Sequence, residues 1–168
     1  SIKDNNIDFH EFPFVDINHT QLIEKIRSSS IDYMIFCRGG ILKNEILSLR
    51  TKFIHLHPGI VPSYRGSTCF HYSILNENNS GVTAFIMDKG LDTGDIIYQK
   101  YFEKPSHKYL DEVYDPHIRS ETLVELLTTK ELPFSNLKKQ DSTLGETYFI
   151  IHPVLKHIAI LSCIDSNV

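Results

Sequence analysis

Residues 53–66 read FIHLHPGIVPSYRG and combine a strand pattern with a turn-rich loop. Its first part, FIHLH (53–57), is short and mostly apolar, which is typical of a buried strand. The rest (58–66) holds two prolines and two glycines, so we expect an ordered loop there. His57 then stands at the carboxyl end of a strand, where open α/β sheets bind their ligands.

Strands and helices alternate on both sides of this stretch. Further strands are expected at 7–14, 33–37 (YMIFC), 82–88 (VTAFIMD), 95–102 (DIIYQKYF) and 147–151 (TYFII). Helices are expected at 18–29, 43–49, 67–75, from Asp115 through Leu127, and at 153–161. This order predicts an α/β domain with a mostly parallel twisted sheet and helices on both faces.

Several helix details follow from the residue pattern. Asn18 or Thr20 can cap the first helix, and Ser67 or Thr68 the third. Pro116 fits the first turn of the fourth helix. That helix is expected to turn four apolar side chains inward: Ile118, Leu123, Leu126 and Leu127.

Composition restricts the class of protein. The 168 residues are 41% hydrophobic, which suits one compact domain over 1–168, with a catalytic core at about 33–128 and a closing strand and helix at 147–162. The net charge of −4 and the lack of a basic run speak against nucleic acid or an anionic membrane as partners. Three scattered cysteines and no long apolar run favour a reduced, cytoplasmic protein. A homodimer is compatible with this sequence.

Ionisable side chains gather in three glycine-containing segments, 38–42, 57–66 and 88–95. The six residues are Arg38, His57, Arg65, Asp88, Asp92 and Asp95. Each has an ordinary structural explanation, since a His beside Pro is often a turn residue and an Asp before Thr-Gly often bonds to its own turn. Read one by one, these residues predict no activity.

The combination is more specific. HLHPGIVPSYRG (55–66), GVT (81–83) and DKGLDTGDII (88–97) resemble the folate-dependent formyltransferases. This family includes methionyl-tRNA, glycinamide ribonucleotide and amino-sugar N-formyltransferases. The resemblance implies a Rossmann-like core and formyl transfer from 10-formyltetrahydrofolate to an amine.

The resemblance also implies roles for single residues. His57 matches the catalytic histidine, Asp92 the catalytic aspartate, and His55 stands where the family has asparagine. Alternation along a strand puts His55 and His57 on one face. An imidazole at 55 can replace the amide as a hydrogen-bond donor to the formyl oxygen, while His57 moves protons and Asp92 orients it.

Two loops are expected to hold the pterin ring, and a third to receive the amine. By resemblance the pterin contacts come from Arg38, Gly39, Gly40, Ile41, Leu42, Met87, Asp88 and Gly90. Tyr64, Arg65 and His71 are expected to line the entry of the amine. A small amine, led by a nucleotide-linked amino sugar for surface polysaccharide, fits the acidic chain better than methionyl-tRNA.

Two alternatives remain open. His55, His57 and Asp92 have the composition of a metal site, so a metal-dependent hydrolase is one alternative to the folate enzyme, which needs no metal. The other is a folate-binding module without transfer activity, because His55 departs from the family's asparagine.

The region before 33–37 differs from the family as well. Members open with a strand, a turn, a helix and a second strand before the part matching 7–14, and those elements have no match here. Either the chain is a fragment, or strand 7–14 fills the vacant place and pairs in parallel with 33–37 through a right-handed βαβ unit. The second case gives a shorter sheet with a more open edge.

Overall fold

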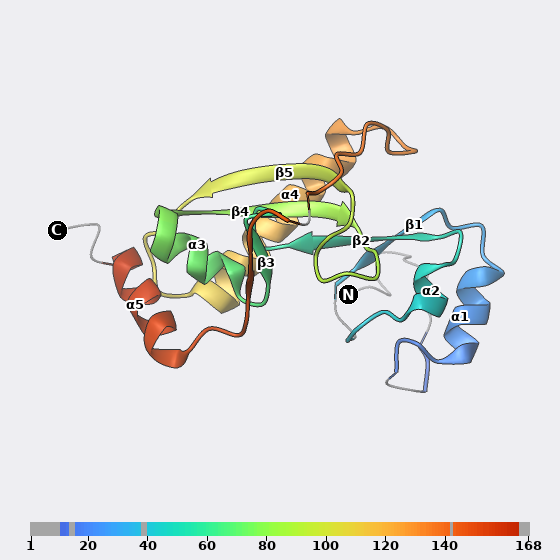
Figure 1. The fold of residues 1–168 in the computed structure, drawn as a ribbon, viewed down its shortest axis with the longest axis horizontal. Coiled ribbons are helices and arrows are strands. Elements are labelled where there is room, and N and C mark those ends of the chain that lie inside the picture. The colour runs from blue at the N-terminus through green and yellow to red at the C-terminus, as the bar shows by residue number, and fades with distance from the viewer. Residues whose placement is uncertain (1–10, 14–15, 38–39, 142, 165–168) are drawn as a thin grey trace, which may run out of the picture.

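A computed structural model describes residues 11–13, 16–37, 40–141 and 143–164 (Figure 1). The elements in chain order are α1 (Thr20–Arg27), β1 (Tyr33–Phe36), α2 (Asn44–Leu47), β2 (Lys52–His57), β3 (Tyr64–Gly66), α3 (Cys69–Glu77), β4 (Asn79–Ile86), β5 (Ile96–Glu103), the π-helical turn η2 (Leu110–Tyr114), α4 (Asp115–Thr129), β6 (Glu146–Tyr148) and α5 (Pro153–Ile164).

The main sheet of the described residues has four strands in the order β1-β2-β4-β5. The α/β class is confirmed, but the described strands of this sheet do not show the expected majority of parallel pairs. Strands β1 and β2 are parallel, whereas β2–β4 and β4–β5 are antiparallel. The short connection 87–95 returns the chain directly beside β4, and a connection of this length permits only antiparallel pairing.

The two faces of β2 contact different helices. Ile54 and Leu56 belong to the core cluster that includes α4, whereas Phe53 packs with α1 and α2. His55 and His57 alternate with Ile54 and Leu56, so both histidines lie on the same face as Phe53. Helices therefore cover both faces of the sheet, as expected. In Figure 1, α1 and α2 lie at one end of the sheet and α3 and α5 at the other.

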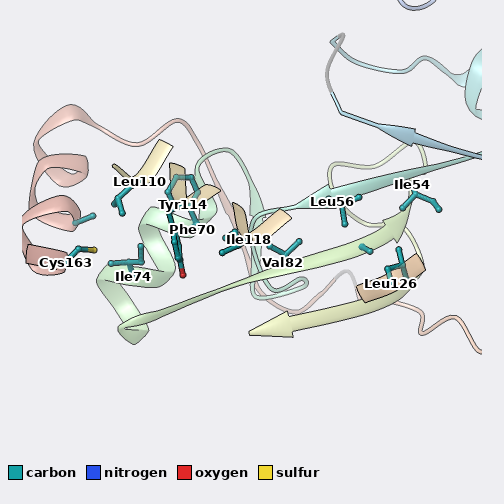
Figure 2. Packing of buried hydrophobic residues seen from close by; sticks show 12 residues of the cluster. Ile54, Leu56, Phe70, Ile74, Val82, Leu110, Tyr114, Ile118, Leu126 and Cys163 are labelled. Carbon is teal, nitrogen blue, oxygen red and sulfur yellow. The ribbon is translucent and has the colours of Figure 1, made fainter. Parts of the chain in front are cut away.

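The larger core cluster joins α3, η2, α4 and α5 to the strands (Figure 2). Its buried members are Ile54, Leu56, Phe70, Ile74, Val82, Ala84, Leu110, Tyr114, Ile118, Leu126, Ala159 and Cys163. Helix α4 contributes Ile118 and Leu126, with Thr122 also fully buried between them. The inward position expected for Leu127 is wrong: it is 54% exposed, because its neighbour Leu126 takes the core position.

The predicted cap of α1 is wrong, and that of α3 is confirmed in position only. The side chain of His19, rather than Asn18 or Thr20, accepts the capping hydrogen bond at the start of α1. Asn18 instead donates to Ile41 O and accepts from the backbone N–H of Lys43. At α3 the cap position falls on Thr68, whose side chain makes no capping bond and accepts from the N–H of Ile151.

A short parallel pair, β3–β6, connects the chain's last third to the loop after β2. The sequence predicts no strand within 58–66, so this pairing is a correction. Gly66 has φ +100°, and a Cβ there would lie 2.1 Å from Tyr148 O, so the pairing requires glycine. Helix α5 then packs on α3 through Ala159 and Cys163. Residues 146–164 thus cover β3 and α3.

The expected strand 7–14 lies mostly outside the described residues. Residues 11–13 are described and form no strand, while 7–10 and 14 are not described. Its parallel pairing with 33–37 therefore stays a prediction. Within the described ranges, the structure contains no helix with the length and apolar character to cross a bilayer.

Candidate active site

His57 and Asp92 meet at the carboxyl end of β2. His57 is the last residue of that strand, and Asp92 lies in the connection between β4 and β5 with φ +54°. The Nδ1 atom of His57 is 3.5 Å from Oδ2 of Asp92. The same oxygen accepts a 2.7 Å hydrogen bond from the N–H of Gly66. The carboxylate is therefore fixed beside the imidazole.

The other ring nitrogen of His57 determines its tautomer. Nε2 lies 2.9 Å from the carbonyl oxygen of Tyr64, which can only accept, so Nε2 carries the hydrogen. Nδ1 then faces Asp92 with its lone pair. The His57 side chain is 2% exposed. Burial lowers the pKa of His57, and the Asp92 carboxylate opposes this effect only in part.

His55 lies beside His57 on the same face, as the alternation predicts. The two ring centroids are 6.1 Å apart, and Nδ1 of His55 lies 3.1 Å from the carbonyl oxygen of Phe36. Burial lowers the pKa of His55, while the hydrogen bond to Phe36 raises it. His55 is thus neutral near pH 7, with Nδ1 donating and Nε2 carrying the lone pair.

Asp115 and Arg119 form an ion pair near the start of α4 that the sequence reasoning missed. Asp115 is buried, and its Oδ1 atom has no hydrogen-bond partner among the described residues. Burial raises the pKa of Asp115. The charges of both residues act on the pKa of His55, Arg119 lowering it and Asp115 raising it. In the sequence, Asp115-Pro116 indicates only the start of a helix.

Gln140 is a second residue that the sequence did not reveal. Its side-chain N–H groups donate to the carbonyl oxygens of Asp92 and Gly94, at 3.0 and 2.7 Å. The connection that carries Asp92 is therefore held by a residue far along the chain. A lone glutamine in a polar stretch gives no sequence signal for such a role.

The first expected pterin-binding segment is described only in part, because Arg38 and Gly39 lie outside the described residues. Gly40 has φ +92° and open space around it, and Ile41 is 86% exposed. Leu42 is buried in the cluster with Phe53, so its side chain belongs to the core. Gly40 offers open backbone and Ile41 an exposed apolar side chain, which suits a flat ring.

The second expected segment packs against the same cluster. Met87 contacts it, and the Met87 N–H donates to Phe53 O over 2.7 Å. Asp88 accepts from the N–H of Gly90 and from the hydroxyl of Thr93. A Cβ on Gly90 would lie 2.0 Å from that hydroxyl, so the turn itself requires this glycine. Both segments thus flank one cluster, with core or turn roles for Leu42, Asp88 and Gly90.

A cavity of about 710 Å³ borders the second segment. It is lined by residues that include Tyr33, Lys52, Met87, Asp88 and Lys89. Lys52 is the first residue of β2, whereas His57 is the last. The cavity thus borders the opposite end of β2 from the histidine pair.

The three residues expected at the amine entry are buried, and their role there stays a prediction. Tyr64 donates its hydroxyl to Glu77 and stacks on Tyr148, with ring centroids 5.2 Å apart. Arg65 donates to Leu144 O. His71 is fully buried, with Nε2 3.7 Å from Oδ1 of Asp111. The β3–β6 pair and α5, which the sequence analysis did not place there, cover this surface.

The family model for formyl transferase matches residues 7–124, a range that contains His57 and Asp92. The chain belongs to this family. Methionyl-tRNA formyltransferase from Thermotoga maritima is 34% identical over 140 residues, or 79% of this chain and 45% of the relative. The corresponding enzyme from Desulforamulus reducens is 44% identical over 79 residues, or 46% of this chain and 24% of the relative.

A solved structure of another family member has a similar fold. The formyltransferase PseJ from Anoxybacillus kamchatkensis, in complex with UDP-4,6-dideoxy-4-formamido-L-AltNAc and tetrahydrofolate, aligns with a TM-score of 0.63 at 19% identity. The alignment covers 88% of this chain and 77% of PseJ. The chain spans less than half of the length of the two curated formyltransferases compared above.

Proposed function

We propose that this chain transfers a formyl group from 10-formyltetrahydrofolate to a small primary amine. The observation that carries the proposal is the contact between His57 Nδ1 and the Asp92 carboxylate, which is held by the Gly66 N–H. The formyl transferase match includes both residues. Tetrahydrofolate in the solved PseJ structure supports a folate as the formyl donor.

The tautomer of His57 suits it to act as a base. Attack of an amine on a formyl carbon leaves an excess proton on the amine nitrogen and negative charge on the formyl oxygen. Nδ1 of neutral His57 accepts that proton, because Nε2 already donates to Tyr64 O. Asp92 stabilises the resulting imidazolium. The same proton then goes from Nδ1 to the departing folate nitrogen.

His55 suits the role of a donor only when its ring is protonated. Nδ1 is engaged with Phe36 O, so a hydrogen bond to the formyl oxygen has to come from Nε2. Burial lowers the pKa of His55, while the negative charges of Asp92 and Asp115 favour the protonated ring. Developing negative charge on the formyl oxygen adds to that effect. We infer that His55 assists transfer by this donor role.

We favour an amino sugar carried on a nucleotide as the acceptor, in a cytoplasmic enzyme. The net charge of −4 opposes binding of a polyanion such as tRNA. The PseJ structure holds a UDP-linked formamido sugar, which supports this class of acceptor. The compared relatives from Thermotoga maritima and Desulforamulus reducens are methionyl-tRNA formyltransferases, so tRNA is the competing acceptor.

An acceptor panel tests this proposal. The purified chain is incubated with 10-formyltetrahydrofolate and either nucleotide-linked amino sugars, free amino sugars or methionyl-tRNA. Tetrahydrofolate release is followed together with the mass of the formylated product. We expect one formylated sugar per folate released. Formylation of methionyl-tRNA alone would overturn the acceptor class, and folate release without a formylated product would overturn the transferase function.

A further inference from the structure

Three potential metal ligands converge at the end of β2. One atom from each of His55, His57 and Asp92 lies within 4.8 Å of the other two. The two histidines come from alternate positions of one strand, and Asp92 comes from the connection between β4 and β5. Two imidazoles and a carboxylate form a donor set that suits zinc and similar divalent ions.

Backbone carbonyl groups fix both imidazoles in tautomers that suit a metal. Nδ1 of His55 donates to Phe36 O, and Nε2 of His57 donates to Tyr64 O. The lone pairs are therefore on Nε2 of His55 and Nδ1 of His57. Metal-binding histidines usually donate their second N–H to a carbonyl or carboxylate in this way.

A cation between His57 and Asp92 would stabilise their contact. Nδ1 of His57 presents a lone pair to Oδ2 of Asp92 at 3.5 Å, and two acceptors at this distance repel each other. The same oxygen also accepts a hydrogen bond from the Gly66 N–H. A metal ion between these atoms, or a proton on Nδ1, removes the repulsion.

The distance between His57 Nδ1 and Asp92 Oδ2 fits two ligands of a tetrahedral ion. Zn–N bonds of roughly 2.0–2.1 Å place two ligand atoms of a tetrahedron about 3.4 Å apart. The 3.5 Å between Nδ1 and Oδ2 matches this edge. The other two pairs of ligand atoms lie within 4.8 Å, so His55 would have to move inward by up to about 1.4 Å to complete the tetrahedron. Three protein ligands leave the fourth position open, which is typical of catalytic rather than structural zinc.

We propose that the chain binds one Zn²⁺-class divalent cation through His55 Nε2, His57 Nδ1 and the Asp92 carboxylate. His55 completes this site, because the asparagine that the family resemblance implies there is a poor zinc ligand. The inference goes beyond the proposed formyl transfer, which uses the same side chains in their metal-free form. It concerns binding by these three side chains alone.

A titration with Co²⁺ tests the site without folate or amine. The full chain is first freed of metal by a chelator. Co²⁺ in a site of low coordination number gives intense visible bands, and Zn²⁺ should displace it at a ratio of one. We expect His55→Asn and Asp92→Asn to weaken binding by more than the roughly 10–100-fold that loss of an outer hydrogen-bond partner costs.

His157→Asn is the matched control, since His157 is exposed on α5. It should keep the bands and the affinity of the wild-type chain. Circular dichroism checks that each variant is folded, and two different ligand variants guard against a single misfolded one. Absence of the visible bands, or equal affinity in the wild-type chain and His55→Asn, would overturn the metal site. Neither result bears on formyl transfer, which is measured separately in metal-free buffer.

Discussion

The carbonyl oxygen of Tyr64 accepts a 2.9 Å hydrogen bond from Nε2 of His57, seven residues before it in the chain. The loop after β2 therefore turns back onto the histidine that ends the strand. This bond fixes which ring nitrogen faces Asp92, and both the proposed proton transfer and the proposed metal site depend on it.

Gly59 makes this close return of the chain possible. A Cβ at position 59 would lie 2.7 Å from His57 Nε2 and 2.9 Å from Tyr64 O. We expect Gly59→Ala to displace the imidazole, lower the free energy of unfolding by about 1–3 kcal/mol and reduce formyl transfer. Thermal unfolding and turnover measure the two effects. A variant with wild-type values for both would show that the loop is not this tightly fitted.

His55 can be tested by two substitutions. If its imidazole replaces the family's amide donor, His55→Asn should preserve or raise formyl transfer. His55→Ala should lower it, because it removes a donor to the formyl oxygen. Steady-state turnover with a fixed acceptor measures this difference. If Asn is as harmful as Ala, then His55 does not act as that donor.

His71 should make stability depend on pH. Burial lowers its pKa, and Asp111 and Lys156 act in opposite directions. The unfolded chain takes up a proton near the ordinary value of about 6.5, while the folded chain resists it. The stabilising contribution is therefore fully present above about pH 6.5 and is lost as the pH falls toward the lowered pKa.

Urea unfolding between pH 7.5 and 5 measures this loss, which should not exceed about 1.4 kcal/mol per pH unit for one group. His71→Leu should reduce the dependence without abolishing it, because burial also lowers the pKa of His55 and of His57. His117→Gln, at an exposed position, should leave it unchanged. An unchanged slope in His71→Leu would show that other groups cause the acid sensitivity.

Tyr148 should help to hold β6 against β3 and α3. Its ring lies 5.2 Å from that of Tyr64 and 4.5 Å from that of Tyr72. We expect Tyr148→Ala to destabilise the fold by about 1–3 kcal/mol. Phe149 is 80% exposed, so Phe149→Ala should change stability by no more than about 0.5 kcal/mol. If both variants lowered thermal stability equally, the Tyr148 ring would not be what stabilises the packing of β6.

Local patterns predicted the part of the site that lies within single elements. Alternation alone places His55 and His57 on one face of β2, and the structure agrees. The residue pattern was less reliable for α4. Leu126 and Leu127 are adjacent on this helix, so they cannot both face the core. Thr122 takes the core position between Ile118 and Leu126.

Long-range pairings could not be predicted in the same way. Tyr64 and Arg65 look available in the sequence because nothing local indicates that β6 pairs with β3. Asp115 reads as a helix start, since its electrostatic effect on His55 depends on how α4 packs against the sheet. These contacts are stabilised by tertiary packing, and a short segment of sequence carries little information about such packing.

If the His57–Asp92 pair performs formyl transfer, Asp92→Asn should abolish most of it. The measurement is the turnover of 10-formyltetrahydrofolate with the acceptor found in the panel. Asp32→Asn, in an exposed ion pair with Arg50, serves as the control. We predict a loss of about 100-fold or more in kcat for Asp92→Asn with its fold intact, and wild-type turnover for Asp32→Asn. Near-normal turnover by folded Asp92→Asn would contradict the account.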